Sequence, residues 1–305
     1  MSLLDKIPQD EKFKLNIKHH SENVEIWCVL LDNMTLKVKH WKIEDKSEDL
    51  TLREIWLNEV RQLNRLKSIG NSSKYLELLY KSHIDEKGYY LIYKTSEETI
   101  TLREFIEDNI KDIKTNRQNF KLKLNYHWIH PLGLKKIENR IILWKNILKI
   151  VRAIKILHDQ GIVHRNISLD AILVDDSQDN DEESDKFKLS GFEWSIYLNN
   201  LKKVDYSPII KSEIINSSTS NDWWSLGNII KEILHSNDFE LFLSKSEINI
   251  LKALEDNNEN KKNLLNAEVI EKIIKNIINE LPQYDNNNYN VYFKSNDNQE
   301  SDGYK

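Results

Sequence analysis

The stretch that decides the fold is His164–Val174, HRNISLDAILV, followed further along the chain by Lys188–Ser195, KLSGFEWS. Both segments are rich in apolar residues, and three positions within them carry neither a base nor a side chain that could ligate a metal ion. Asn166 is an amide, Ala171 ends at a methyl group and Gly191 has no side chain. An amide cannot carry the negative charge of a base, and neither alanine nor glycine offers the oxygen ligand that Mg²⁺ requires.

The two segments resemble the catalytic and metal-binding loops of eukaryotic-type protein kinases, whose patterns are H-R-D-x-x-x-x-N and D-F-G. His164, Arg165 and Phe192 match these patterns. In unrelated folds a short H-R pair carries little meaning, so the resemblance depends on the order and spacing of further motifs. These extend over roughly residues 13–280 and are more specific in the second half of the chain.

The resemblance implies roles for the positions that differ from the family. In kinases one aspartate accepts the proton of the substrate hydroxyl, while an asparagine and a second aspartate hold the metal ions that neutralise phosphoryl charge. Asn166 stands at the first of these positions, Ala171 at the second and Gly191 at the third. We therefore expect no catalytic residue, no metal site and no requirement for Mg²⁺. The triplet at this point reads GFE, ending at Glu193.

Composition bounds the class of protein. The 305 residues are 30% charged and 39% hydrophobic, with a net charge of −5, which suits one two-lobed domain and gives no general attraction to nucleic acid or anionic membrane. The single cysteine, Cys28, excludes an internal disulfide framework. No apolar run approaches a membrane span. We expect a cytoplasmic, soluble protein with a protein partner, no nucleic acid and no membrane association.

The region that corresponds to the nucleotide-binding loop has an unusual composition. Kinases use glycines there because only glycine lets the backbone approach the phosphates, but the first glycine of this chain is Gly70. The corresponding hairpin, 13–31, carries His19, His20 and Glu22 near its expected turn. We therefore expect ATP to bind weakly or not at all.

The strand after this hairpin leaves two candidates for the lysine that contacts nucleotide in kinases. Residues 24–31 and 35–43 read as paired strands because they are rich in β-branched and aromatic residues. Lys39 follows the alternation of the second strand better, whereas Lys42 sits better before the isoleucine that ends it. Either is also compatible with a solvent-facing strand lysine.

A helix follows, and its start and its acid are both predicted. Thr51–Glu54 has the form of a capping box, and apolar residues at helical spacing then indicate an amphipathic helix. The resemblance implies that Glu59 pairs with the strand lysine, as in the helix that the family calls αC. A second capping box is predicted at Thr101–Glu104, and further strands are expected over 74–80 and 88–93.

Two stretches interrupt the pattern. Residues 112–135 form a basic and aromatic insertion, which we interpret as an exposed ornament rather than a nucleic-acid or zinc site. Residues 175–185 are nearly all acidic or polar, which is typical of a solvated loop.

The best-kept motif is Asp222–Gly227, DWWSLG, which resembles the D-x-W-S-x-G pattern of the family. Asp222, Trp224 and Gly227 match it, and the resemblance implies that the aspartate ties a central helix to the H-R-D turn. At 206–209 the family's A-P-E region lacks its glutamate, and only Lys261 and Lys262 stand where its arginine partner is expected.

These observations predict an α+β, bilobal, protein-kinase-like fold. We expect a small β-rich N-lobe with one helix of the αC type over 1–94 and a larger helical C-lobe over 95–283. The C-lobe is abbreviated after the αF helix, with two helices over 246–256 and 266–280 and a stop at Pro282. Residues 284–305 are poor in apolar side chains and are expected to be a disordered tail.

The predicted function is that of a catalytically inactive kinase-like domain, or pseudokinase, which serves as a scaffold or as an allosteric regulator of a protein partner. Two alternatives stay open. The first is an atypical Ser/Thr kinase in which Asp170 or Glu193 recruits the metal. The second is a metal-independent ATP-binding sensor, which requires Lys39 or Lys42 in an open cleft.

Overall fold

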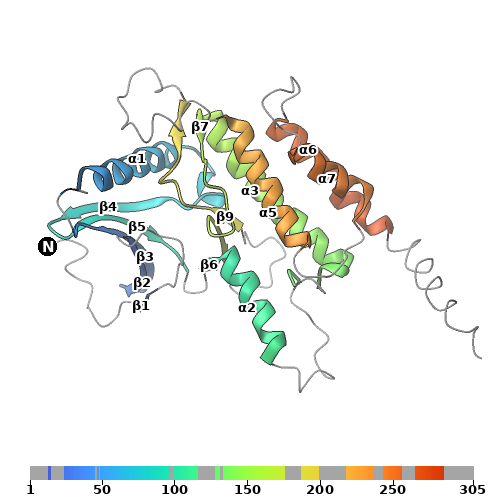
Figure 1. Ribbon diagram of the computed structural model, residues 1–305, viewed down its shortest axis with the longest axis horizontal. Helices are drawn as coiled ribbons and strands as arrows, with labels where there is room; N and C mark the ends of the chain where they lie inside the picture. The colour runs from blue at the N-terminus through green and yellow to red at the C-terminus, as the bar shows by residue number, and fades with distance from the viewer. Residues whose placement is uncertain are drawn as a thin grey trace, which may run out of the picture.

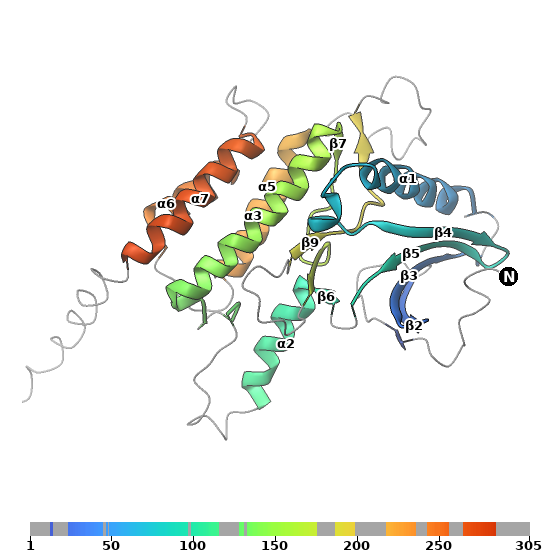
Figure 2. The same cartoon turned by 180° about the vertical axis from the view of Figure 1, so that it is seen from behind.

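The computed structural model has a β-sheet region followed by a helical region, which Figure 1 and Figure 2 show from opposite sides. The residues that it describes are 13–14, 24–44, 47, 49–96, 99–115, 128–130, 133–175, 187–198, 218–235, 243–255 and 265–284. The observed class is α+β, as predicted, and the order of sheet and then helices is compatible with a kinase-like fold.

A five-stranded antiparallel sheet forms the first region, in the order β1-β2-β3-β5-β4. Its strands are β1 (Phe13–Lys14), β2 (Val24–Leu31), β3 (Met34–Lys42), β4 (Leu79–Asp85) and β5 (Gly88–Lys94). The predicted hairpin of β2 and β3 is confirmed. Asp32 and Asn33 in its turn both have positive φ, 50° and 60°, which matches the twist of the paired strands. Central strand β3 is buried along most of its length and carries two lysines into the interior.

Helix α1 (Asp49–Lys67) packs against β4 and β5. The amphipathic pattern is confirmed, since its apolar residues Leu63 and Leu66 are fully buried. The predicted start at the Thr51 capping box is wrong, because the helix begins at Asp49. The Asp49 carboxylate suits the positive end of the helix dipole and also accepts a hydrogen bond of 2.5 Å from the Tyr89 hydroxyl.

The strand expected over 74–80 begins later than predicted, at the start of β4, and is preceded by a 3₁₀ turn, η3 (Ser72–Lys74). Before β4 the backbone turns instead toward the helical region. The Glu77 amide donates to the Leu189 carbonyl, and the Leu189 amide donates to the Tyr75 carbonyl, both at 2.9 Å. This segment therefore joins the two regions.

Small sheets lie where the regions meet. Strands β6 (Thr99–Thr101), β8 (Ile172–Asp175) and β9 (Phe187–Leu189) form one, and β7 (Ile162–Val163) pairs with β10 (Ile196–Tyr197) in the other. Helix α2 (Leu102–Thr115) starts at the predicted capping box, which is confirmed. The Thr101 amide donates to Glu104 at 3.0 Å, and the Glu104 amide donates to the Thr101 hydroxyl at 3.2 Å.

After α2, the described residues of the second region form four further α-helices. They are α3 (Ile137–Asp159), α5 (Thr219–His235), α6 (Lys245–Glu255) and α7 (Ala267–Tyr284), and α3 is preceded by the 3₁₀ turn η5 (Gly133–Lys135). α3 and α5 lie side by side, with α6 and α7 outside them (Figure 1, Figure 2). The two helices predicted after the DWWSLG motif are thus present. The predicted stop at Pro282 is wrong, because α7 continues to Tyr284. A proline this close to the end of a helix removes only one amide donor from the last turn.

A buried ion pair that the sequence analysis did not predict joins α3 to α6. The Arg140 guanidinium binds the Glu247 carboxylate, with 3.1 Å between Nε and Oε1. Glu247 also accepts hydrogen bonds from the Trp144 indole at 2.8 Å and the Ser244 amide at 2.7 Å. The positions at which loss of a different pair was predicted, near 209 and 261–262, lie outside the described residues.

The insertion over 112–135 is not the exposed ornament that we expected, as far as it is described. Trp128 and His130 are buried. The Trp128 ring lies 6.0 Å from that of Phe105 in α2 and 6.1 Å from that of Phe187 in β9. The Trp128 ring therefore covers apolar surface of α2 and β9, a contact that the periodicity of the sequence does not reveal. Residues 116–127 lie outside the described part of the chain.

Three further predictions also fall outside it: the histidine-containing hairpin tip near residue 20, the acidic loop beyond Asp175 and the tail after Tyr284. Among the helices of the described residues, none has the length and apolar character needed to cross a membrane.

Candidate functional site

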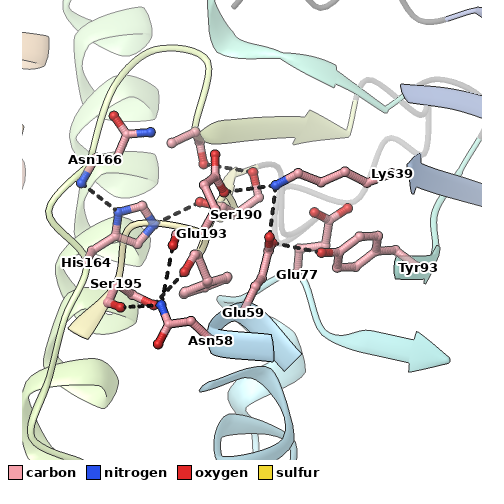
Figure 3. Close-up of polar contacts among 12 residues, drawn as sticks. Lys39, Asn58, Glu59, Glu77, Tyr93, His164, Asn166, Ser190, Glu193 and Ser195 are labelled. Carbon is pink, nitrogen blue, oxygen red and sulfur yellow. Dashed lines mark hydrogen bonds and ion pairs between the residues drawn. The ribbon is translucent and has the colours of Figure 1, made fainter. Parts of the chain in front are cut away.

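The candidate site is a cleft between the sheet and the helical region, with a volume of about 390 Å³. Its lining includes all three positions that the sequence analysis singled out as degenerate, Asn166, Ala171 and Gly191, together with Lys39 and Glu59. The fold thus brings together residues that lie far apart in the sequence. Figure 3 shows the polar contacts on one side of this cleft.

Lys39 lies at the centre of an ion triad. Its Nζ is 2.9 Å from Glu59 Oε2 in α1 and 2.9 Å from Glu193 Oε2 in the loop after β9 (Figure 3). All three side chains are almost fully enclosed, with exposed fractions of 6%, 1% and 12%. Burial would lower the pKa of Lys39, but the charges of Glu193 and Glu59 outweigh burial and raise that pKa above its ordinary value. Lys39 is therefore a fixed cation.

Glu59 is held from two sides. It receives the Lys39 ammonium and accepts a hydrogen bond of 3.0 Å from the Tyr93 hydroxyl (Figure 3). Burial raises the pKa of Glu59, although Lys39 opposes this shift. One lysine cannot fully compensate two buried carboxylates, so the second carboxylate, Glu193, adds to the rise.

The other lysines of β3 have different environments. Lys42, the alternative candidate, points away from this triad and pairs at 2.5 Å with Glu25, where both side chains are about one third exposed (32% and 33%). Lys37 shares the face of Lys39, two residues away, and donates at 2.6 Å to buried Glu77. The Lys37 ammonium also lies 4.9 Å from the centre of the Tyr93 ring. The inner wall of the cleft is consequently charged.

Asp222, at the start of α5, organises the loop that holds Asn166. Its carboxylate accepts hydrogen bonds from the backbone amides of His164 at 2.9 Å and Arg165 at 2.8 Å, and it contacts the His158 ring at 2.9 Å. Arg165 has a positive φ of 68°, a strained conformation that needs such support. This is the architectural role that the resemblance implied for Asp222.

His164 connects this loop to the segment that carries Gly191. The backbone amide of Asn166 donates to His164 Nδ1 at 3.3 Å, so Nε2 bears the proton and donates to the Ser190 carbonyl at 2.8 Å (Figure 3). Burial lowers the pKa of His164, which agrees with a neutral ring. Its ring also meets that of buried Phe192 edge to face, at 5.1 Å between centroids.

The segment after Gly191 is tied directly to α1. The Asn58 side-chain amide donates to the backbone carbonyls of Ser195 at 2.7 Å and Glu193 at 3.3 Å (Figure 3). Farther along α1, the Arg65 guanidinium lies 4.0 Å from the centre of the Tyr197 ring in β10. The position of α1 is thus fixed by three contacts with this segment, of which the ion triad is one.

The residues around the cleft do not fit a magnesium ion. Gly191 and Ala171 contribute no ligand atom, and the carboxylates nearest to them are engaged by cations. Glu193 binds Lys39. Both carboxylate oxygens of Asp170 accept hydrogen bonds from Arg103 Nε, at 2.9 and 3.1 Å. Nowhere in the described part of the chain do three or more His, Cys, Asp or Glu side chains gather as a metal site would require.

Comparison with known proteins adds one likeness to this geometry. The chain is 26% identical over 231 residues to a protein of Acanthamoeba polyphaga mimivirus named "Putative serine/threonine-protein kinase R436". The alignment covers 74% of the chain and 64% of that relative. This likeness supports a protein-kinase-like relationship, and the chain spans less than two thirds of the relative's length. No protein-family model matches it.

Sequence reasoning missed two features of this kinase-like cleft. The ion pair of Lys37 and Glu77 was detectable in part, since alternation along β3 places Lys37 on the same face as Lys39. The contact between Lys39 and Glu193 was not, because Glu193 lies two residues after Gly191, whose left-handed φ of 76° is not specified by sequence spacing. Trp224, the tryptophan of DWWSLG that matches the family pattern, has an exposed fraction of 53% in the described part of the structure.

Proposed function

We propose that this chain is a pseudokinase, a kinase-like domain that transfers no phosphate and serves as a scaffold or allosteric regulator of a protein partner. The observation that carries the proposal is the double ion pair of Lys39 with Glu59 and Glu193. It stands in a cleft whose chemical positions are Asn166, Ala171 and Gly191.

Charge supports weak or absent ATP binding. In a kinase the strand lysine attracts nucleotide phosphates, with metal ions neutralising the rest of their charge. Here the Lys39 ammonium already contacts two carboxylates, and Lys37 is neutralised by Glu77. A phosphate that approached Lys39 would meet the Glu193 carboxylate at the same nitrogen, and like charges a few ångströms apart repel strongly in a partly buried site.

The same contacts support a scaffold. Kinases need nucleotide and metal in place to complete their active arrangement, whereas here protein groups fill these roles. Glu193 binds the lysine, and Asn58 binds the backbone around it. The shape of this region therefore depends on no ligand, which suits a protein that works through a fixed surface.

A metal-independent ATP-binding sensor is the second candidate. It is favoured by the Lys39–Glu59 pair at a hollow of about 390 Å³. Phe192 does not line this hollow; it is buried and packs edge to face against His164. An atypical Ser/Thr kinase is favoured only by the name of the mimivirus relative. Against it, Glu193 and Asp170 would each have to leave a cation before binding metal.

Thermal unfolding with millimolar ATP, with and without Mg²⁺, tests these proposals, because a ligand of the folded state raises the midpoint. We expect no shift and no transfer of labelled phosphate to a generic protein substrate. A metal-independent shift without transfer would favour the sensor. Transfer that needs Mg²⁺ and is lost in Lys39→Met would overturn the pseudokinase proposal.

A restored variant, Asn166→Asp with Ala171→Asn and Gly191→Asp, is the matched control. A Cβ at residue 191 would meet its nearest atoms at 3.7 Å, and aspartate tolerates positive φ better than most residues. If the three lost groups are what prevents metal binding, this variant gains a Mg²⁺-dependent shift that the natural chain lacks.

A further inference from the structure

A second hollow lies beside the cleft and has a volume of about 420 Å³. It is bounded by the segment leading into β4, by the connection after β5 and by the β8–β9 hairpin. We call it the basic groove. Its floor is apolar and consists of Leu76, Leu78, Leu79 and Leu173. Leu173 also lines the cleft, and it is the residue that the two hollows have in common.

Three lysines from separate elements surround this floor: Lys67 at the end of α1, Lys94 at the end of β5 and Lys188 in β9. Within the described part of the chain, none of them forms an ion pair with a carboxylate. The Lys94 ammonium instead lies 4.6 Å from the centre of the Tyr80 ring. Lys67 and Lys94 are exposed, so their charges face solvent at the rim.

The carboxylates of the lining leave the groove with an excess of positive charge. The charge of Glu77 is neutralised by its buried ion pair with Lys37. Asp175 accepts a hydrogen bond of 3.0 Å from the Ser96 hydroxyl and brings a single negative charge against the three lysines. In a chain whose net charge is −5, this excess is a local reversal of sign, and it attracts an acidic ligand.

Shape and backbone favour an extended peptide over other anions. β4 is an edge strand of the five-stranded sheet among the described residues, and its first residues, Leu79 and Tyr80, line the groove. Extended segments bind beside sheet edges, where alternate side chains enter pockets. A leucine floor suits an apolar side chain, whereas single-stranded nucleic acids need aromatic platforms, and here Tyr80 is covered on one face by Lys94.

We propose that the basic groove binds an acidic, extended peptide segment of a partner protein, with an apolar side chain on the leucine floor and carboxylates at Lys67, Lys94 and Lys188. This gives the partner of the proposed scaffold a chemistry. The groove and the nucleotide cleft are different hollows, with Leu173 as their common lining residue. Failure of the peptide-binding proposal would therefore not decide whether the cleft binds nucleotide, and the reverse also holds.

Selection of a random eight-residue peptide library against the full chain tests the proposal. We expect selected peptides to combine several Asp or Glu residues with a Leu, Ile, Val or Phe. Fluorescence anisotropy of a selected peptide should show binding that weakens with added salt. Carbodiimide, which joins amines to carboxylates in contact, should link this peptide to the three groove lysines.

The variant Lys67→Ala/Lys94→Ala/Lys188→Ala should bind the peptide about tenfold to a hundredfold more weakly, since three contacts with exposed charges are lost. The matched control removes three exposed lysines from α6 and α7, Lys245, Lys252 and Lys272, and should bind like the natural chain. Among the residues that the structure describes, these three have no carboxylate partner. Both variants change exposed or half-buried lysines that have no ion pair among the described residues, and both should keep the natural unfolding midpoint.

Three results would overturn the proposal. The first is a set of selected peptides with no acidic enrichment, and the second is a groove variant that binds as tightly as the control. In the third, acidic peptides bind only after the six acids within residues 176–186 are replaced by their amides. That result would assign the groove to the chain's own acidic segment, which leaves β8 at Asp175 and returns just before Lys188.

Discussion

Replacing Lys39 with methionine removes the cation that Glu59 and Glu193 share and keeps an unbranched side chain. Each contact of 2.9 Å corresponds to a gross attraction of about 6 kcal/mol at an effective dielectric constant of about 20. Desolvation offsets much of this, and removing one partner of a buried pair typically costs about 3–5 kcal/mol. We expect the free energy of unfolding to fall by that amount at about pH 8.

The loss should depend on pH. Without Lys39, only the Tyr93 hydrogen bond still opposes the burial that raises the pKa of Glu59, so this carboxylate takes up a proton more readily in the folded variant. A group whose pKa is raised on folding contributes stability below its unfolded pKa, and that contribution disappears as the pH rises through the folded pKa. The deficit relative to the natural chain should therefore be smaller at about pH 5 than at about pH 8.

Urea unfolding followed by tryptophan fluorescence measures both quantities. Lys42→Met is the matched control, because the Lys42–Glu25 pair is about one third exposed (32% and 33%) and such pairs contribute less than about 1 kcal/mol. A loss for Lys39→Met as small as that of the control would refute the reasoning. So would a loss that is the same at both pH values.

The remaining predictions concern the packing of α5 on α6, the buried Arg140–Glu247 pair and the contact of Glu193 with Lys39. Gly227→Ala should lower the free energy of unfolding by about 1–3 kcal/mol in the same urea assay, because the new Cβ would lie 2.8 Å from Leu254 Cβ; a gain, as helix propensity alone predicts, would contradict this packing. Arg140→Met should cost about 3–5 kcal/mol, and adding Glu247→Leu should recover part of it by removing the orphaned charge; a further loss in the double variant would contradict this. Glu193→Gln should tighten ATP binding by about tenfold, or about 1.4 kcal/mol, so that millimolar ATP raises the unfolding midpoint of the variant but not that of the natural chain; no shift in the variant would show that Glu193 does not compete with phosphate.

The parts of the fold that local patterns encode were predictable. The β2–β3 hairpin follows from two β-rich runs flanking Asp32 and Asn33, and α2 follows from its capping box at Thr101. The placement of Glu59 opposite a strand lysine followed from the family resemblance, and the structure pairs it with Lys39. In these cases, residues near in sequence or a well-spaced motif determine the outcome.

Other features depend on contacts between distant segments, and these escaped prediction. The start of α1 at Asp49 involves Tyr89, forty residues away, and the burial of Trp128 depends on surfaces of α2 and β9. The choice between Lys39 and Lys42 was open because alternation and family spacing disagree. It depends on which lysine faces Glu59 in the assembled sheet, which tertiary packing decides.

The contrast between kept and lost residues gains a physical reason from the ion triad. Asp222 and His164 still hold their loops together, so the architecture needs none of the lost chemistry. Yet a lysine left buried beside one glutamate, without phosphate or metal, would still leave an open anion site. Glu193 fills that site with a carboxylate of the chain itself. The lack of a metal-ligating side chain at Ala171 and Gly191 and the presence of an acid at residue 193 thus support the same proposal, in which a kinase-like arrangement persists without nucleotide.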